Sequence, residues 1–337
     1  MRYLSRILNS ATDARKGLRG TRPAICRATV RVVWCVCLGA CLLTSQRAPA
    51  MEVFAEFLHW RATEPVDWTL DTNRLPSDQF VAYETIDYDF TPGLRAGIAR
   101  EGPLGAKLYY TRFHTTAEQS ISGNLTPAFL GGKLALSDAP ASSPAYFDNG
   151  QVRAAIDYNM FDCDFGRSFR PLPSLRVRPV VGLRAGWIHQ TFDAQFEDLS
   201  VSKQISEHIE NNFWGIGPKI GIENTWRLGG GERCRIHAVA HFHAAYLLGD
   251  WRIRDETTLT APGVHSERFI PIDNRDFGAL AFQAIVGIHL EYGRWSAMAG
   301  YEINDWLNQC QIFDDATGPH NNDLLLQGLV VNASCRF

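Results

Sequence analysis

The residues of this sequence best suited to chemistry are ionisable side chains that recur at every second position. Three of them are His237, His241 and His243, and a later segment adds His289 close to Glu291. Imidazole and carboxylate groups bind Zn²⁺ or Cu²⁺, so the four histidines form a hypothetical metal site. Histidines that bind water and neighbouring acids on a polar strand face give the same pattern. We adopt this simpler interpretation and predict no metal and no cofactor.

A second set of charged residues alternates with apolar residues and predicts a polar face on several strands. In LRVRPVVGLRAGW, residues 175–187, every arginine falls on one face. If such strands cross a membrane, an Arg or Lys on the lipid side costs about 2–4 kcal/mol at mid-depth, so we expect these charges to face inward. They would then either select permeating ions or pair with one another and plug a narrow interior. The candidate pore-lining residues are Arg153, Asp157, Arg176, Arg178, Arg184, Lys219, Glu223 and Glu291.

Composition and charge exclude several classes of function. Of the 33 Lys and Arg, nine lie in residues 1–50, against one of the 36 acids, which leaves 24 bases, 35 acids and a net charge of −11 for residues 51–337. Nucleic acids need a basic surface, so we predict no nucleic-acid partner. The sequence has no phosphate-binding loop, nucleophile elbow or metalloprotease motif. The four cysteines after residue 50 show neither a zinc pattern nor a disulfide framework.

The N-terminal 50 residues have the pattern of an export signal. A basic region up to Arg31 precedes the apolar run 32–43, which has 12 residues and is too short to span a membrane as a helix. An Ala-Pro-Ala cleavage pattern follows at 48–50. We predict a signal sequence over 1–50 and a single exported domain over 51–337. A lipoprotein signal ending at Cys41 and an anchoring helix are the alternatives.

The exported part is dominated by the period-two alternation of β-strands. In FWGIGPKIGIENTWRL, Trp214 and Trp226 share the apolar face and lie 12 residues apart. At about 3.3 Å per residue and a tilt near 40°, they stand roughly 30 Å apart along a membrane normal, as two aromatic girdles would. The predicted lipid-facing girdle residues are Trp187, Trp214, Trp226 and Phe337. The alternation predicts ten strands, near 51–61, 91–100, 105–114, 151–168, 175–195, 212–228, 233–253, 277–292, 294–308 and 323–337.

The connections between these strands alternate in length. The short ones are 101–104, 169–174, 229–232 and 293, and the long ones are 62–90, 115–150, 196–211, 254–276 and 309–322. Outer-membrane barrels have short periplasmic turns and long extracellular loops. We therefore predict an all-β fold, a transmembrane antiparallel up-and-down β-barrel of about ten strands. A further pair of strands around 80–90 would give twelve.

The last strand, GLVVNASCRF, ends on an aromatic residue at its lipid-facing parity. In a closed barrel the last strand pairs with the first, which satisfies every backbone polar group in lipid. An aromatic end resembles that of outer-membrane proteins generally, where the assembly machinery reads it. The predicted partners are outer-membrane lipid, the barrel assembly machinery, which would bind the strand ending at Phe337, and small solutes or ions. The oligomeric state stays open.

Acids and histidines in the long connections suggest a rim site, because some ten-stranded outer-membrane barrels are proteases with Asp and His groups at the extracellular rim. No spacing among them is diagnostic, and loop acids are more often solvated than catalytic. We therefore predict no enzyme activity. The rim residues are Asp193, Glu197, Glu207, His208, Glu210, Asp255, His265 and Asp276.

Several segments resemble the pore-forming outer-membrane family related to the Legionella major outer membrane protein. They are EFLHWRATE at 56–64, RPVVGLRAGWI at 178–188, NNFWGIGPKIGIENTWRL at 211–228, AGYEINDWLN at 299–308 and the closing strand. The resemblance covers nearly all of 51–337 and implies a β-barrel porin in a bacterial outer membrane. It brings no catalytic residues with it. The long connections do not match, so a role in adhesion does not transfer.

The predicted function is pore formation with passive diffusion of small hydrophilic solutes or ions. The alternative is a narrow, plugged barrel that serves as a structural or adhesin-like surface protein through its extracellular loops. A rim enzyme ranks third.

Overall fold

The computed structural model describes residues 51–72, 82–100, 102, 104–138, 146–231, 233–272, 277–312 and 323–337. The predicted signal sequence, residues 1–50, lies outside the described residues and stays a prediction. Among the residues described, no helix is both long and apolar enough to cross a membrane.

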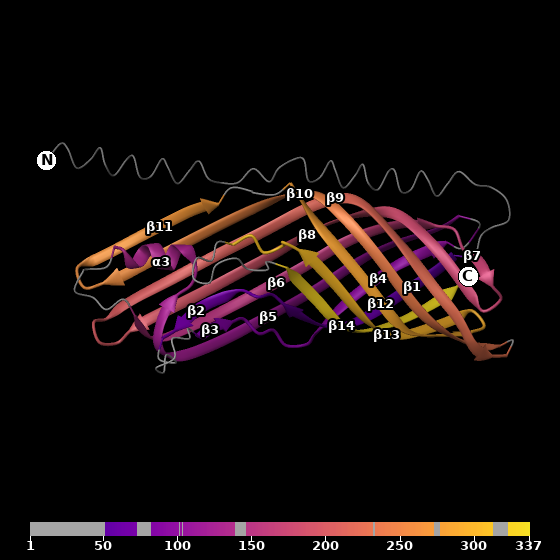
Figure 1. Cartoon of the computed structure of the whole chain (residues 1–337), viewed down its shortest axis with the longest axis horizontal. Helices are drawn as coiled ribbons and strands as arrows, with labels where there is room; N and C mark the ends of the chain where they lie inside the picture. Colours follow the sequence, from indigo (N-terminus) through magenta and orange to yellow (C-terminus); the bar gives the residue numbers. More distant parts are fainter. Residues whose placement is uncertain are drawn as a thin grey trace. The chain divides into compact units, whose positions relative to one another are not determined.

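Ten antiparallel strands form a closed barrel (Figure 1). In order round the barrel they are β1 (Met51–Thr63), β4 (Thr91–Arg100), β5 (Gly105–Pro127), β6 (Phe147–Gly166), β8 (Leu175–Asp198), β9 (Lys203–Gly230), β10 (Cys234–Ala261), β12 (Gly278–Tyr292), β13 (Trp295–Leu307) and β14 (Leu324–Arg336). Closure is between β14 and β1, where Glu52 lies opposite Arg336 and the amide of Phe337 donates to the carbonyl of Met51 at 2.8 Å. The predicted ten-stranded antiparallel barrel is confirmed.

Four further strands and one short helix are not part of the barrel wall. They are β2 (Asp67–Asp71), β3 (Ala82–Thr85), β7 (Phe169–Leu172), β11 (Val264–Ile272) and α3 (Leu130–Leu136). β2 and β3 fall where the twelve-stranded alternative placed an extra pair. They pair with each other, and β2 pairs with the far end of β5, so neither enters the ring. The twelve-stranded alternative is therefore wrong.

The strands on one side of the barrel are longer than the sequence predicted. β5, β8, β9 and β10 contain 23, 24, 28 and 28 residues. The predicted loop 196–211 is mostly strand, and only a turn over 199–202 separates β8 from β9. Polar outward side chains in these extensions gave them the composition of loops, although the apolar residues between them face inward.

The outer surface divides these strands into two halves. Trp187 and Trp214 lie opposite each other on β8 and β9. From this level to the short turns the outward side chains are apolar and exposed, as at Val181 and Ile220, which are 61% and 62% exposed. We call this part the membrane half. Beyond the two tryptophans lies the extracellular half, where outward side chains such as Asp193 are polar.

Short turns connect the strands at the open end of the membrane half, where both β1 and β14 have their outer ends. Short turns face the periplasm in outer-membrane barrels, so this end is periplasmic. In Figure 1 it is the end that carries β7 and the C-terminus, whereas α3 and β11 lie at the other end of the barrel.

Candidate functional site

A set of buried ion pairs crosses the interior of the membrane half. Arg95 on β4 lies opposite Glu56 on β1 and donates to it, with 2.6 Å between Nη1 and Oε2. The same guanidinium donates to Glu302 on β13, with 2.7 Å between Nη2 and Oε1. Gln283 on β12 donates to the same carboxylate at 2.6 Å. Four strands are thereby linked through the lumen rather than through the wall alone.

The network continues to the opposite wall. Arg184 on β8 donates through Nε to Asp162 on β6 at 2.8 Å and through Nη2 to Gln283 at 2.8 Å. Lys219 on β9 donates to Asp162 and to Asp164, each at 2.9 Å. Because Gln283 contacts both clusters, they form one network, which we call the charge layer. It consists of Glu56, Arg95, Asp162, Asp164, Arg184, Lys219, Gln283 and Glu302.

The charge layer is almost completely buried. No member is more than 4% exposed. Three cations face four carboxylates, so charge is nearly balanced, as burial of ions requires. Arg184 and Lys219 were predicted to line a pore, and here they are 2% and 1% exposed within ion pairs. Their predicted role in selecting solutes stays a prediction.

An aromatic layer lies next to the charge layer, on the side away from the periplasm. Trp60, Tyr158 and Trp306 each stand four residues from a member of the charge layer on the same strand, and so on the same inward face. Their rings touch: the centroids of Trp60 and Tyr158 lie 6.4 Å apart, and those of Tyr158 and Trp306 lie 5.8 Å apart. The full aromatic layer is Trp60, Phe113, Tyr158, Phe213, Trp251 and Trp306, and no member is more than 2% exposed. Water therefore reaches neither face of these rings.

Beyond the aromatic layer, α3 folds into the interior of the extracellular half. The amide of Gly131 donates to Asp255 on β10 and that of Gly132 to Glu207 on β9, both at 2.8 Å. A Cβ on Gly131 would collide with Asp255 and Thr257, so this close approach requires glycine. Burial raises the pKa of Glu207 well above its ordinary value, and the neighbouring charge of Asp255 raises it further. Burial also raises the pKa of Asp255, so the folded state favours the protonated form of both carboxyl groups.

Two further segments close the extracellular half from within. The carbonyl of Gln309, which follows β13, accepts from Asn211 Nδ2 and from Trp251 Nε1, each at 3.1 Å. At the end of β1, Glu64 accepts from Gln190 Nε2 at 2.5 Å. Burial raises the pKa of Glu64 to about 7. These contacts attach the ends of two long connections to the barrel interior.

The periplasmic part of the lumen is different, because its side chains are partly exposed. Arg178 and Glu223 form an ion pair at 2.7 Å, and their side chains are 18% and 16% exposed. Glu291 pairs at 3.0 Å with Arg235, whose side chain is 44% exposed. Arg176 is also partly exposed on the inward face of β8. Four of the predicted pore-lining residues, Arg176, Arg178, Glu223 and Glu291, thus lie in a vestibule that water enters from the periplasm.

The four histidines lie in the same region but do not converge on one point. The rings of His237 and His289 have centroids 6.0 Å apart, and each has a nitrogen 3.8–3.9 Å from Glu291. His243 instead faces Glu223, at 3.7 Å. Within the described parts of the chain, no group of three or more His, Cys, Asp and Glu is arranged to hold a metal ion. His237, His243 and His289 thus interact with neighbouring acids, and the absence of a metal stays a prediction.

The predicted inward placement of Arg153 and Asp157 is wrong. Both lie on the outer wall of the extracellular half, where Arg153 pairs with Glu118 at 3.2 Å and Asp157 contacts His114 at 2.9 Å. The residues that alternate with them, such as Ala154 and Ile156, are buried inside. Parity separated the two faces correctly, but this stretch of β6 stands in water, so its apolar face turns to the interior.

The rim residues occupy both faces of the wall and form no single constellation. Glu207 and Asp255 hold α3 on the inside, whereas His208 pairs on the outside with Asp193, at 2.6 Å, and with Glu210, at 3.8 Å. Asp193 raises the pKa of His208 by hydrogen bonding and by charge, against the effect of burial. His265 contacts Glu267 at 3.5 Å on β11. Asp276 lies outside the described residues.

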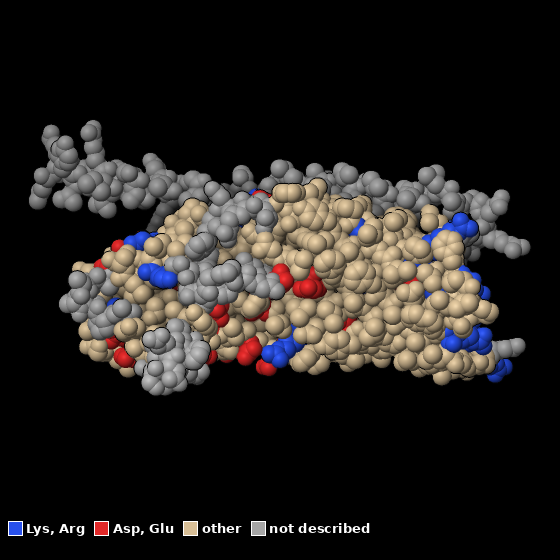
Figure 2. Space-filling view, in the orientation of Figure 1, with Lys and Arg blue, Asp and Glu red and all other residues tan. Residues whose placement is uncertain are grey.

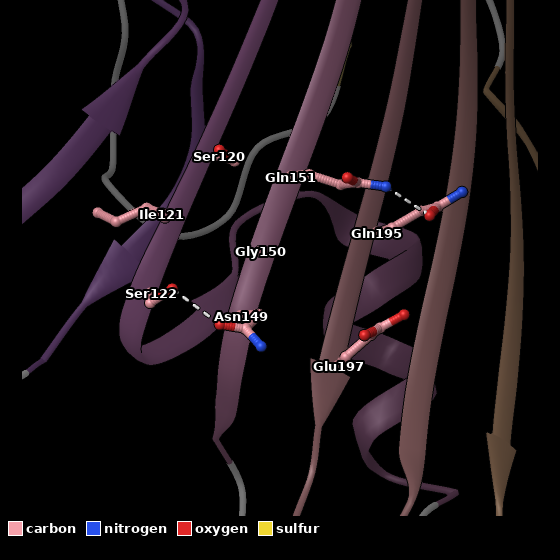
Figure 3. A pocket seen from close by; sticks show the side chains of 8 residues that line it. All are labelled: Ser120, Ile121, Ser122, Asn149, Gly150, Gln151, Gln195 and Glu197. Atoms are coloured by element: carbon pink, nitrogen blue, oxygen red, sulfur yellow. Dashed lines mark hydrogen bonds between the residues drawn. The ribbon is translucent and has the colours of Figure 1, made fainter.

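A shallow pocket of about 190 Å³ lies on the outer wall of β5, β6 and β8. Figure 3 shows its mostly polar lining, in which Ser122 donates to Asn149 at 2.8 Å and Gln151 to Gln195 at 2.7 Å. Of the rim residues, Glu197 lines it. Four of its side chains are thus paired with one another, and none of its lining residues belongs to the charge layer or the aromatic layer.

The predicted girdle residues all lie on the outer wall. Trp187 and Trp214 are 44% and 43% exposed at the boundary with the extracellular half. Trp226 and Phe337 are 37% and 74% exposed near the periplasmic turns. Their contact with lipid stays a prediction.

Comparisons with known proteins point to one family. The family described as Legionella pneumophila major outer membrane protein precursor matches residues 44–337. No curated protein matches the chain.

Solved structures give only distant likenesses. The outer membrane protease OmpT from Escherichia coli has 10% identity and a TM-score of 0.38, with 88% of this chain and 98% of that chain covered. The toluene transporter TodX from P. putida has 9% identity and a TM-score of 0.34, with 87% and 91% covered. Likenesses of this size carry no argument about activity.

The family match spans most of the sequence, and the closed barrel with its apolar outer band agrees with it. The protein is therefore an outer-membrane β-barrel, and the chain belongs to the family of the Legionella pneumophila major outer membrane protein precursor.

Proposed function

We propose that this protein is a closed-lumen outer-membrane barrel that acts at the cell surface through its extracellular half. The observation that carries the proposal is the filling of the lumen at two successive levels. No residue of the charge layer or the aromatic layer is more than 4% exposed. A passage for hydrated solutes would leave inward side chains in contact with water at every level.

The extracellular half supports a role at the surface. β9 and β10 run far beyond the membrane half, and α3 and the segments around Glu64 and Gln309 fill its interior with contacts instead of leaving an open mouth. The outward faces of these strands are polar and available to partners. The extracellular half could support the cell surface structurally or bind an external partner.

Pore formation with passive diffusion is the second candidate, and the vestibule favours it. Water reaches Arg178 and Glu223 from the periplasm. The charge layer that ends this accessible region consists of side chains, which can change rotamer. A rearrangement of Arg95 and Arg184 away from their carboxylates would connect the vestibule with the level above. Such an opening has to break buried ion pairs, which makes it costly.

A rim enzyme has less support. The acids inside the extracellular half bind backbone amides of α3, and the Asp193–His208 pair stands on the other face of the wall. Among the described rim residues, no nucleophile and base converge on a common space. The absence of enzyme activity stays a prediction.

Liposome swelling tests the first candidate against the second. The folded protein, verified by heat-shifted gel mobility, is reconstituted into liposomes that are then diluted into isotonic solutions of small sugars. We expect no swelling beyond that of empty liposomes. Swelling whose rate falls with sugar size would support the porin candidate. A double variant, Arg95→Ala with Arg184→Ala, serves as a test of whether the charge layer is the seal.

A further inference from the structure

Four exposed arginines gather on the periplasmic turns of the barrel. They lie in the three segments between β6 and β8, between β9 and β10, and between β12 and β13. We call Arg167, Arg170, Arg233 and Arg294 the arginine rim. Figure 2 shows blue Lys and Arg atoms at the end of the barrel where Figure 1 places β7 and the C-terminus.

Backbone hydrogen bonds hold these turns together. The amide of Arg227 donates to the carbonyl of Ser174 at 2.7 Å, which ties β9 to the turn before β8. The amide of Gly293 donates to the carbonyl of Arg233 at 3.3 Å, and the carbonyl of Arg294 accepts from Arg336 at 2.9 Å. The rim is therefore a connected platform and not a set of independent loops.

The rim has almost no compensating charge. Among the described residues, none of its four members forms an ion pair, although Arg167 lies 5.7 Å from the Phe169 ring centroid. The sequence of the three turns contains one acid, Glu232, which lies outside the described residues. Most of the guanidinium donors thus face solvent without a partner within the described chain.

The position of the rim relative to lipid follows from a collar of exposed apolar residues beside it. Phe169, Tyr292, Trp295 and Phe337 are 51%, 63%, 59% and 74% exposed on the outer wall. Aromatic girdles mark the boundary between hydrocarbon and headgroups. Turns immediately beyond the girdle lie at the depth of the headgroup phosphates, within reach of long arginine side chains.

We propose that the arginine rim binds the phosphate groups of anionic phospholipids in the periplasmic leaflet. A guanidinium presents a planar fork of donors that fits phosphate oxygens in a bidentate manner. Anionic headgroups such as phosphatidylglycerol add a net charge that zwitterionic headgroups lack. Each arginine near such a surface strengthens binding about fivefold. The inference concerns the outer wall and does not depend on whether the lumen conducts.

Tryptophan quenching by brominated lipid tests this proposal, because Trp226 and Trp295 lie next to the rim on the outer wall. The folded protein is reconstituted in phosphatidylcholine vesicles that contain either brominated phosphatidylglycerol or brominated phosphatidylcholine. The rim variant carries Arg167→Gln, Arg170→Gln and Arg294→Gln. The matched control carries Arg112→Gln, Arg153→Gln and Arg254→Gln, which are exposed outward arginines of the extracellular half. Both variants change net charge equally.

We expect the wild type to prefer phosphatidylglycerol by about 25-fold at low salt, as two engaged arginines would give. The preference should vanish in the rim variant and persist in the control. An equal preference in wild type and rim variant, or an equal loss in both variants, would overturn the proposal. If the triple variant does not fold, the single variants Arg170→Gln and Arg294→Gln should each lower the preference severalfold, and no change in either would count against it.

A competition experiment distinguishes binding of lipid phosphate from binding of a soluble phosphate compound. Inorganic phosphate, added at the same ionic strength as sodium chloride, should reduce the preference no more than chloride does. A greater reduction by phosphate would assign the rim to a soluble phosphate compound and overturn the lipid assignment.

Discussion

The two halves of a single strand, β8, place opposite chemistry on the same face. In the membrane half, Val181 points outward, whereas Arg184 points inward. In the extracellular half, Asp193 points outward and Phe192 inward. The backbone alternation continues unbroken, so only the surroundings of the wall differ. Where lipid surrounds the wall, outward residues are apolar and charged residues lie inside. Where water surrounds the wall, outward residues are polar and apolar residues lie inside.

The two interiors are therefore held together by different forces. The charge layer depends on matched partners, because a buried ion that loses its counterion is strongly destabilising. The interior of the extracellular half is a hydrophobic core with rings in contact, such as Phe213 and Trp251, whose centroids lie 4.5 Å apart. The stability of such a core decreases when a substitution changes the volume of a side chain or buries a polar group without a partner. Substitutions in each half should show this difference.

The largest effect should come from breaking the charge layer. Arg95→Leu removes the cation shared by Glu56 and Glu302, and we expect a loss of about 3–5 kcal/mol in the free energy of unfolding. Guanidinium unfolding in micelles, followed by tryptophan fluorescence, measures it. Arg153→Leu, on the exposed outer wall, should cost less than about 1 kcal/mol. A similar small cost for both variants would mean that the charge layer does not hold the membrane half together.

A charge placed on the outer face should lower the free energy of unfolding by different amounts in the two halves. Val181→Arg puts a guanidinium on the lipid side near mid-depth and should cost about 2–4 kcal/mol. Gln195→Arg, on the same face of the same strand, meets water and should change stability by less than about 0.5 kcal/mol. The same unfolding assay compares them. Equal costs would show that the boundary does not lie at Trp187.

The pH dependence should be specific to the extracellular half. Burial raises the pKa of Glu64 to about 7, above the 4.5 of a free glutamate, so the folded state favours the protonated form. Its contribution is present at low pH and is lost as the pH rises from about 4.5 to about 7. Between pH 5 and pH 8 the loss amounts to about 2–3 kcal/mol.

Glu64→Gln provides the control for this prediction. The amide stays neutral, so the variant should lose that part of the pH dependence while it keeps a polar group for Gln190. Denaturant midpoints of both proteins between pH 5 and pH 8 measure the difference. Parallel curves would contradict a buried, proton-binding Glu64.

The smallest expected effect concerns an exposed pair on the outer wall. Asp193 holds the pKa of His208 above its ordinary value, so Asp193→Asn should lower the pKa of that histidine in an NMR titration. Stability should hardly change, because both side chains are about half exposed. A large loss of stability would mean that outward pairs of the extracellular half matter as much as the buried layers.

The sequence was sufficient for the ring of ten strands, because alternation and the ordering of short and long connections are local patterns. It failed where the surroundings of the wall change. Parity assigned Arg153 and Asp157 to one face correctly, but only the position of the lipid boundary tells which face is inside. The same change made the extensions of β9 and β10 resemble polar loops.

Only two of the eight members of the charge layer were predicted from the sequence. Arg184 and Lys219 were identified by parity, but Glu56, Arg95 and Glu302 were not singled out. Arg95 and Glu302 are 207 residues apart, and barrel closure brings them together across the lumen. An inward acid at a lipid-crossing position, such as Glu56, carried a usable signal, because it needs a cation at the same depth.

Planar-bilayer conductance of the folded protein tests the closed lumen most directly. If the charge layer and the aromatic layer fill the lumen, the protein should insert into the bilayer without producing stepwise current. Heat-shifted gel mobility of the recovered protein verifies that it was folded. Current through the variant Arg95→Ala with Arg184→Ala would show that the charge layer alone is the seal, and no current would show that the aromatic layer also closes the lumen. Regular stepwise current through the wild-type protein would contradict the closed lumen and establish the porin candidate.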